Sequence, residues 1–198
     1  MSHMQPLARD AHPELAGEFA LMESILGFVP NSVLTMQRRP GIVQGFAALT
    51  RGVMDPAGEV PLGFKRLVAH IASMAVGCQY CEAHSLVAAR IHGVSDEKLA
   101  QILCYEDSPL YTEAERAALD FALRAASVPN TVDAECFARM REHWSEGQIV
   151  EILGVVAIYG FLNRWNDTMA TDLETSPRAM GDRVLAARGW DGGKHVSR

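Results

Sequence analysis

Two cysteines and a histidine lie close together near the middle of the chain. Cys78 and Cys81 are spaced as C-x-x-C, and His84 follows three positions after the second cysteine. Thiols at this spacing can form a disulfide across one helical turn. A thiol at a helix start also ionises more readily, because the unpaired N–H groups and the macrodipole favour the anion. The thiolate is the form that attacks peroxides and disulfides, so this segment predicts a small thiol-dependent redox enzyme.

The same segment predicts a polar stripe on one helix. At about 100° per residue, Cys81 lies roughly 60° from Cys78, and Ser85 falls between them in angle. His84 lies roughly another 60° beyond Cys81 and is still its neighbour. An imidazole beside a thiol can take its proton, and a second cysteine can resolve a sulfenic acid before it oxidises further. This geometry does not decide which cysteine attacks.

Two other interpretations of the stripe remain open. A zinc site could use Cys78, Cys81 and His84, with His70 as a further ligand, but it would need ligands from two helices and no second paired motif is present. Alternatively, both cysteines could be inert and buried, with His84 a satisfied core residue. We expect no cofactor and no metal.

Composition narrows the class of protein. The chain has 198 residues, a net charge of −6 and 48% apolar residues, which suits one large domain or two small ones. Its basic residues are scattered, which argues against a nucleic-acid partner. We find no secretory signal, and the apolar run 149–162 is interrupted by Glu151 and is short for a bilayer span. We therefore expect a cytoplasmic protein without a membrane partner, in which C-x-x-C indicates redox or metal chemistry.

Helical periodicity runs through most of the chain, and no segment reads as a strand. Helices are expected near residues 14–26, 31–39, 42–53, 62–77, 78–92, 113–127 and 133–143, and from 146 through 164 or beyond. Ser95, Thr112 and Ser145 are predicted N-caps, the last two within capping boxes. We treat residues 1–4 as a cloning remnant, 5–175 as one all-helical domain and 176–198 as a loosely attached polar tail. A weak echo between 46–51 and 121–124 hints at two similar helical units.

A family resemblance follows from these motifs. The run from Phe64 to His70 and the segment 77–84 resemble the carboxymuconolactone decarboxylase and alkylhydroperoxidase AhpD-like family, most closely its peroxidase-related branch. The segments 27–32 and 161–167 fit that branch too, so the resemblance spans roughly residues 20–175. It implies an all-α, AhpD-like helical bundle that forms homo-oligomers, commonly dimers, trimers or hexamers. It also implies reduction of a small peroxide, with Cys81 peroxidatic, Cys78 resolving and an unidentified dithiol as reductant.

The chain departs from the family pattern at two positions. The relay histidine expected four residues after the second cysteine is replaced by Ser85, and the glutamate expected twelve residues before the first cysteine by Arg66. His84 would then substitute for the histidine, and Arg66 would favour a thiolate by its charge. His70 would assist if it faces the site, and Tyr80 would line the pocket or merely pack.

The remaining candidates are less specific. Trp165, Asn166 and Asp167 follow the longest apolar helix and are either a solvated helix end or a border of a neighbour's cysteine site. Cys104 and Cys136 are expected to be small buried hydrophobes. The alternative activity is that of a lyase or isomerase acting on a small lactone acid, with His70 or His84 as base and the thiols idle. A non-catalytic helical assembly module is the third possibility.

Overall fold

The regular secondary structure is helical throughout residues 2–196, the part of the chain that this computed structural model describes. This confirms the all-α prediction. The α-helices of this part are α1 (Ala16–Leu26), α2 (Asn31–Met36), α3 (Pro40–Val53), α4 (Leu62–Met74), α5 (Gln79–Ile91), α6 (Asp96–Ala100), α7 (Glu113–Ala126), α8 (Ala134–His143), α9 (Glu146–Met169) and α10 (Thr175–Val184). Short 3₁₀ turns are η1 (Pro13–Leu15), η2 (Ile102–Cys104), η3 (Ala186–Arg188) and η4 (Gly193–His195).

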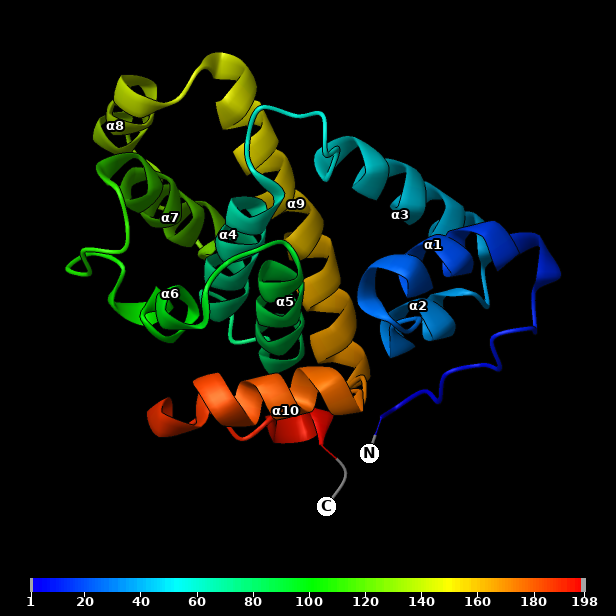
Figure 1. Ribbon diagram of the computed structural model, residues 1–198. Coiled ribbons are helices and arrows are strands. Elements are labelled where there is room, and N and C mark those ends of the chain that lie inside the picture. Colours follow the sequence, from blue (N-terminus) through cyan, green and yellow to red (C-terminus); the bar gives the residue numbers. More distant parts are fainter. Residues whose placement is uncertain (1, 197–198) are drawn as a thin grey trace.

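The helices form two groups on either side of α9 (Figure 1). α1, α2 and α3 gather on one side, whereas α4 to α8 gather on the other, and α10 crosses the end of the bundle against α5. α9 contacts α3, α4, α5, α7 and α8. Within residues 2–196, α9 is also the one helix whose length and composition would suit a membrane span, and here it serves as a central helix of the bundle.

Each group has its own hydrophobic core. The larger core joins α4, α5, α7 and α9. The smaller core lies among η1, α1, α2 and α3 and consists of Leu15, Phe19, Val29, Val33, Met36 and Val43. Phe46 and Leu162 are partly buried against both cores. The boundary between the two cores is therefore lined by apolar side chains from both groups.

The cysteine helix begins where local chemistry predicts. Gly77 has φ +72°, a left-handed conformation that glycine adopts without strain, and it separates α4 from α5. Cys78 is the N-cap of α5, and its N–H donates to the Ser73 carbonyl at 3.1 Å. The predicted caps are also confirmed, since Ser95 accepts from the Lys98 N–H, and Thr112 and Ser145 each form a capping box.

The C-terminal segment differs from its prediction. It forms α10 rather than a loosely attached tail, and Trp190 and His195 are buried. The Trp190 indole donates to the Gln79 carbonyl at 3.3 Å and lies over Gly181, where any Cβ would meet the ring at 2.2 Å. Burial of this indole and of His195 holds the segment on α5, although its sequence is polar.

Two smaller expectations were also wrong. α9 continues to Met169, so Trp165, Asn166 and Asp167 belong to its last turns rather than following it. Tertiary burial extends the helix, because Asn166 is 1% exposed. Cys136 is buried as expected, but Cys104 is exposed because it ends the surface turn η2. The two similar units and the oligomer remain predictions.

Candidate active site

Cys81 lies in the first turn of α5 and is buried. Burial raises the pKa of its thiol well above the ordinary value, and the neighbouring Cys78 and Glu82 act in the same direction. The Asn166 side-chain amide opposes them by donating to Cys81 Sγ at 3.4 Å. The helix start was expected to ease ionisation, but the loss of water around the sulfur outweighs it. A thiol in this setting forms a thiolate only where a nearby group accepts its proton.

His84, one turn after Cys81 in α5, pairs with the carboxylate of Glu174. His84 Nε2 is 2.6 Å from Glu174 Oε2, and both side chains are mostly buried. Because a carboxylate can only accept, Nε2 carries the hydrogen, and Nδ1 is the ring nitrogen left for proton transfer. The Tyr80 hydroxyl donates to Glu174 Oε1 at 2.9 Å, and its ring stacks on the imidazole at 4.2 Å between centroids.

Glu174 is ionised in this setting. Burial by itself would raise the pKa of its carboxyl group, but the pairing with His84 and the hydrogen bond from the Asn31 N–H bring the pKa below the ordinary value. The Asn31 bond measures 2.5 Å. Glu174 is the N-cap residue of α10, at the end of the predicted domain, and its sequence context did not mark it as a candidate site residue. Pro177 in the following turn signals a helix start, but no local pattern links Glu174 to a histidine 90 residues away.

Cys81 and His84 face a common cavity of about 130 Å³, which we name the inner cavity. Its apolar wall comes from α9 and from the group formed by α1, α2 and α3, and it includes Met22, Ile25, Leu26, Pro30, Phe46 and Leu162. Its polar wall is formed by Arg66, Tyr80, Cys81, His84, Tyr159 and Asn166. The inner cavity suits a small, largely apolar molecule whose reactive atom meets the sulfur of Cys81.

The other polar residues of the predicted stripe are turned elsewhere. Ser85 donates to the Glu82 carbonyl at 2.7 Å, and its oxygen lies 3.2 Å from His70 Nδ1. His70 Nδ1 also donates to that carbonyl at 3.1 Å, and burial lowers the pKa of His70 to about 4. His70 and Ser85 therefore form an uncharged, hydrogen-bonded contact between α4 and α5, and neither lines the inner cavity.

The remaining predicted residues divide in the same way. Of the three α9 residues, Asn166 contacts Cys81, whereas the Trp165 indole donates to Thr35 Oγ1 and Asp167 pairs with Lys194. Arg66 lines the inner cavity and donates to the Tyr159 hydroxyl at 3.2 Å. No group of three or more His, Cys, Asp or Glu side chains in residues 2–196 is arranged to hold a metal ion.

Cys78 is buried beside Cys81 and borders a different space. It lines a cavity of about 640 Å³ between the α7 end and α9, with Val128 and Asn163 among its walls. The two cysteines of the C-x-x-C pair thus face separate cavities. Each thiol therefore has its own route of access.

Comparison with known proteins places this geometry in a family. The family model "Carboxymuconolactone decarboxylase family" matches residues 40–124. The uncharacterized protein YnjA of Escherichia coli (strain K12) is 31% identical over 102 residues, which cover 51% of this chain and 55% of YnjA. The match therefore spans only about half the length of this curated relative.

Solved structures cover more of the chain. The debrominase Bmp8, in a cysteine-to-alanine variant crystallised with 2,3,4-tribromopyrrole, is 37% identical with a TM-score of 0.86, covering 91% of this chain and 96% of Bmp8. The AhpD-core, peroxidase-related protein of Ralstonia eutropha JMP134 shares the fold at 23% identity and a TM-score of 0.78, with the same coverage. The chain thus belongs to the carboxymuconolactone decarboxylase family and has an AhpD-like fold.

Proposed function

We propose that this protein is a dithiol-dependent reductase of small hydrophobic electrophiles, in which Cys81 attacks and Cys78 closes the disulfide. The observation that carries the proposal is the position of Cys81, a buried thiol at the wall of an apolar cavity that it shares with His84. A second thiol, Cys78, lies beside it outside that cavity. Such a pair can deliver two electrons while a small substrate occupies the cavity.

The first candidate substrate is a brominated aromatic ring. Bmp8 is a debrominase crystallised with 2,3,4-tribromopyrrole, and its identity with this chain extends over nearly the whole length. The aromatic and aliphatic wall of the inner cavity suits a flat ring of that size, with Phe46, Tyr80 and Tyr159 among its walls.

In this reaction the Cys81 thiolate attacks the bromine atom. The electron pair of the carbon–bromine bond stays on the ring carbon, which takes a proton, and an S–Br bond forms on Cys81. The Cys78 thiolate then attacks the Cys81 sulfur, forms the disulfide and expels bromide. Overall, the aryl bromide and two thiols give the arene, a disulfide, bromide and one proton. The ring carbon is reduced and the two thiols are oxidised.

His84 and Glu174 serve the proton transfers in this scheme. Nδ1 of His84 takes the proton of Cys81 and returns it to the ring carbon, while ionised Glu174 orients the imidazole and balances its charge. The Asn166 amide hydrogen bond stabilises the thiolate. The raised pKa of Cys81 fits these roles. The thiol gives its proton to His84 only as its sulfur attacks the substrate.

A hydroperoxide is the second candidate substrate, favoured by the C-x-x-C pair itself. Here the thiolate of Cys81 breaks the O–O bond and becomes a sulfenic acid, and the alkoxide takes a proton to leave as an alcohol. Cys78 then forms the disulfide and releases water. In either case an external dithiol must reduce the disulfide, and we propose that it reaches Cys78 from the 640 Å³ cavity. We also propose a homo-oligomer for the working protein.

The test is turnover by the reduced protein with dithiothreitol, measured as bromide release from 2,3,4-tribromopyrrole and as consumption of cumene hydroperoxide. We expect a Cys78–Cys81 disulfide by non-reducing peptide mass spectrometry after substrate is added without dithiol. Cys81→Ser should lower turnover by about 10³-fold or more, since the nucleophile is lost. Cys78→Ser should leave a slower reaction that depends on external thiol.

Two results would overturn the proposal. One is the absence of both reactions above a protein-free control. The other is a Cys81→Ser variant as active as the unaltered protein. Activity toward a lactone acid that survives in a Cys78→Ser/Cys81→Ser double variant would instead favour the lyase alternative, with His84 as the base that lines the cavity.

A further inference from the structure

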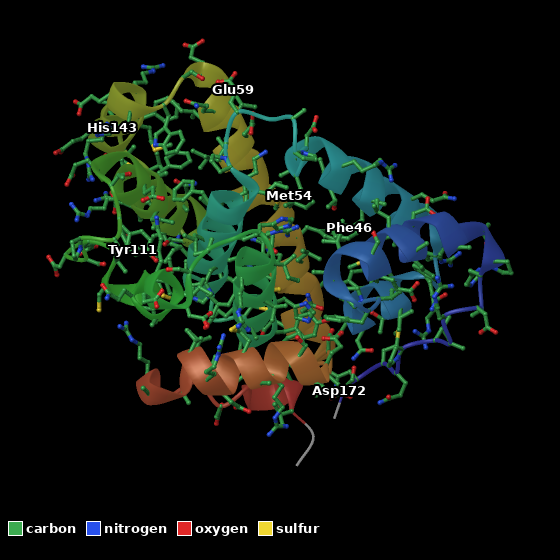
Figure 2. All side chains as sticks on the ribbon, in the orientation of Figure 1. Phe46, Met54, Glu59, Tyr111, His143 and Asp172 are labelled. Carbon is green, nitrogen blue, oxygen red and sulfur yellow. The ribbon has the colours of Figure 1, made fainter. Side chains whose placement is uncertain are left out.

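Arg66 lies at the junction of two cavities. Besides the inner cavity, it lines an outer cavity of about 450 Å³ between α1, α3 and α4. Both cavities also share Met22, Ile25 and Thr50. Figure 2 labels one residue of each cavity, Phe46 of the inner cavity and Met54 of the outer cavity. Both labels lie between α3 and the central helix α9. The two cavities are thus adjacent, and a molecule spanning both would pass Arg66.

The guanidinium of Arg66 has few partners in the protein. One N–H donates to the Tyr159 hydroxyl at 3.2 Å, whereas Nε is buried and has no acceptor among residues 2–196. Within the same residues no carboxylate forms an ion pair with Arg66, in contrast to Arg124 or Arg183. A buried N–H without an acceptor is unfavourable, so this site has unused capacity for one.

The charge around Arg66 favours an anion. Arg51 and His92 also line the outer cavity, and Glu18 is the carboxylate among its lining residues. Burial and the Arg66 charge together lower the pKa of His92, which favours its neutral form. The excess positive charge therefore comes from Arg51 and Arg66 against Glu18. The other lining side chains are mostly aliphatic. An apolar space with excess positive charge is unusual on a chain whose net charge is −6.

We propose that Arg66 binds a carboxylate of the substrate, so that the natural substrate is an apolar acid. This rests on the proposed function, because the acid is the molecule whose electrophilic atom reaches Cys81. The planar guanidinium fork matches a carboxylate with two parallel N–H donors, and the apolar walls strengthen that pairing by excluding water. The carboxylate sits at the junction, the reactive end enters the inner cavity, and the outer cavity holds the remaining apolar part.

The test compares 4-bromobenzoate with 4-bromobenzamide, which have the same shape and differ in charge. Isothermal titration calorimetry on the full chain, reduced and without turnover, should show the acid binding at least about 10-fold more tightly. Arg66→Gln should abolish this preference by weakening the binding of 4-bromobenzoate but not that of 4-bromobenzamide. Arg66→Lys should restore part of the preference, because lysine supplies a point charge without the two parallel donors of a guanidinium group. Arg139→Gln, on α8 and outside both cavities, should change neither affinity.

Equal affinity of the acid and the amide for the unaltered protein would overturn the assignment, as would no measurable binding of 4-bromobenzoate at millimolar concentration. Equal weakening of both ligands in Arg66→Gln would assign Arg66 a purely structural role. Because the assay needs no chemistry, acid preference with no reductase activity would refute the proposed function and leave the Arg66 assignment intact. Reductase activity without a preference for the acid would refute the Arg66 assignment and leave the proposed function intact.

Discussion

Two partly buried carboxylates each tie a distant segment to the bundle in nearly the same way, yet they differ in their partners. Glu151 of α9 accepts from Lys65 Nζ at 2.7 Å and from the Glu59 and Val60 N–H groups at 2.9 and 3.2 Å. Lys65 is 1% exposed in its side chain and also donates to the Val53 carbonyl. Neither Glu151 nor Lys65 lines the inner or the outer cavity. This carboxylate ties the loop between α3 and α4 to α9.

Glu174 also accepts a backbone N–H from a distant segment, at Asn31, the first residue of α2, but its side-chain partners are an imidazole and a phenol. His84 and Tyr80 both line the inner cavity beside Cys81. A lysine ammonium keeps its proton at neutral pH, whereas an imidazole can exchange one. The difference teaches that the partner, rather than the burial of the carboxylate, separates a structural ion pair from one suited to proton transfer.

The largest effect should come from breaking the structural pair. Lys65→Ala removes a fully buried side chain together with its ion pair to Glu151 and its hydrogen bond to the Val53 carbonyl, and we expect a loss of about 3–5 kcal/mol in the free energy of unfolding. Urea denaturation measures this loss, and Lys194→Ala, in the exposed pair with Asp167, should cost less than about 1 kcal/mol. If the two variants were equally stable, the interpretation of the Lys65 pair would be wrong.

The next prediction compares one substitution at Glu174 with one at Glu151, to separate a loss of activity from a loss of stability. Glu174→Gln keeps the shape but loses the charge that orients His84, so kcat/KM should fall about 100-fold, within the range of general acid–base catalysis. Glu151→Gln is the matched control and should lower stability while leaving kcat/KM of the folded protein unchanged. Steady-state kinetics below the unfolding transition measure both. Similar kinetic losses in the two variants would remove the distinction between these carboxylates.

The smallest effect concerns a third carboxyl group, that of Glu82. Burial raises its pKa to about 7. Because folding favours its protonated form, this group contributes stability that is present below about pH 4.5 and lost as pH rises through 7. Glu82→Gln should therefore stabilise the protein by about 2 kcal/mol at pH 8 and hardly at all at pH 4.5. Denaturation at both pH values measures this, and an equal change at both would contradict the assigned cause.

The same variant also tests the cysteine site. Glu82 contributes to the raised pKa of Cys81, so the neutral glutamine should lower that pKa. Iodoacetamide labelling against pH reports the thiolate directly. We expect the labelling profile of Glu82→Gln to move to lower pH, and a move to higher pH would contradict the electrostatic account.

Much of the fold was predictable because its causes are local. Periodicity predicted the helices through α9, Gly77 predicted the break before α5, and the Thr112 and Ser145 capping boxes involve residues only three positions apart. The C-x-x-C pair and the nearby histidine were likewise readable from spacing. Spacing correctly predicted that the cysteines, His84 and Ser85 share one helix. It could not predict which residues of other helices each of these side chains contacts.

Those neighbours come from distant segments. Ser85 was predicted beside the cysteines and instead joins His70 of α4, and His84 meets Glu174, 90 residues further along the chain. Burial, which only the assembled bundle creates, reversed the expected ease of ionisation at Cys81 and packed the polar C-terminal segment through Trp190. The sequence by itself determined the helices and the pair of thiols, because caps and periodicity act within a few residues. Tertiary structure decided the proton partner, the cavity and the thiol pKa, because these depend on which distant groups exclude water together.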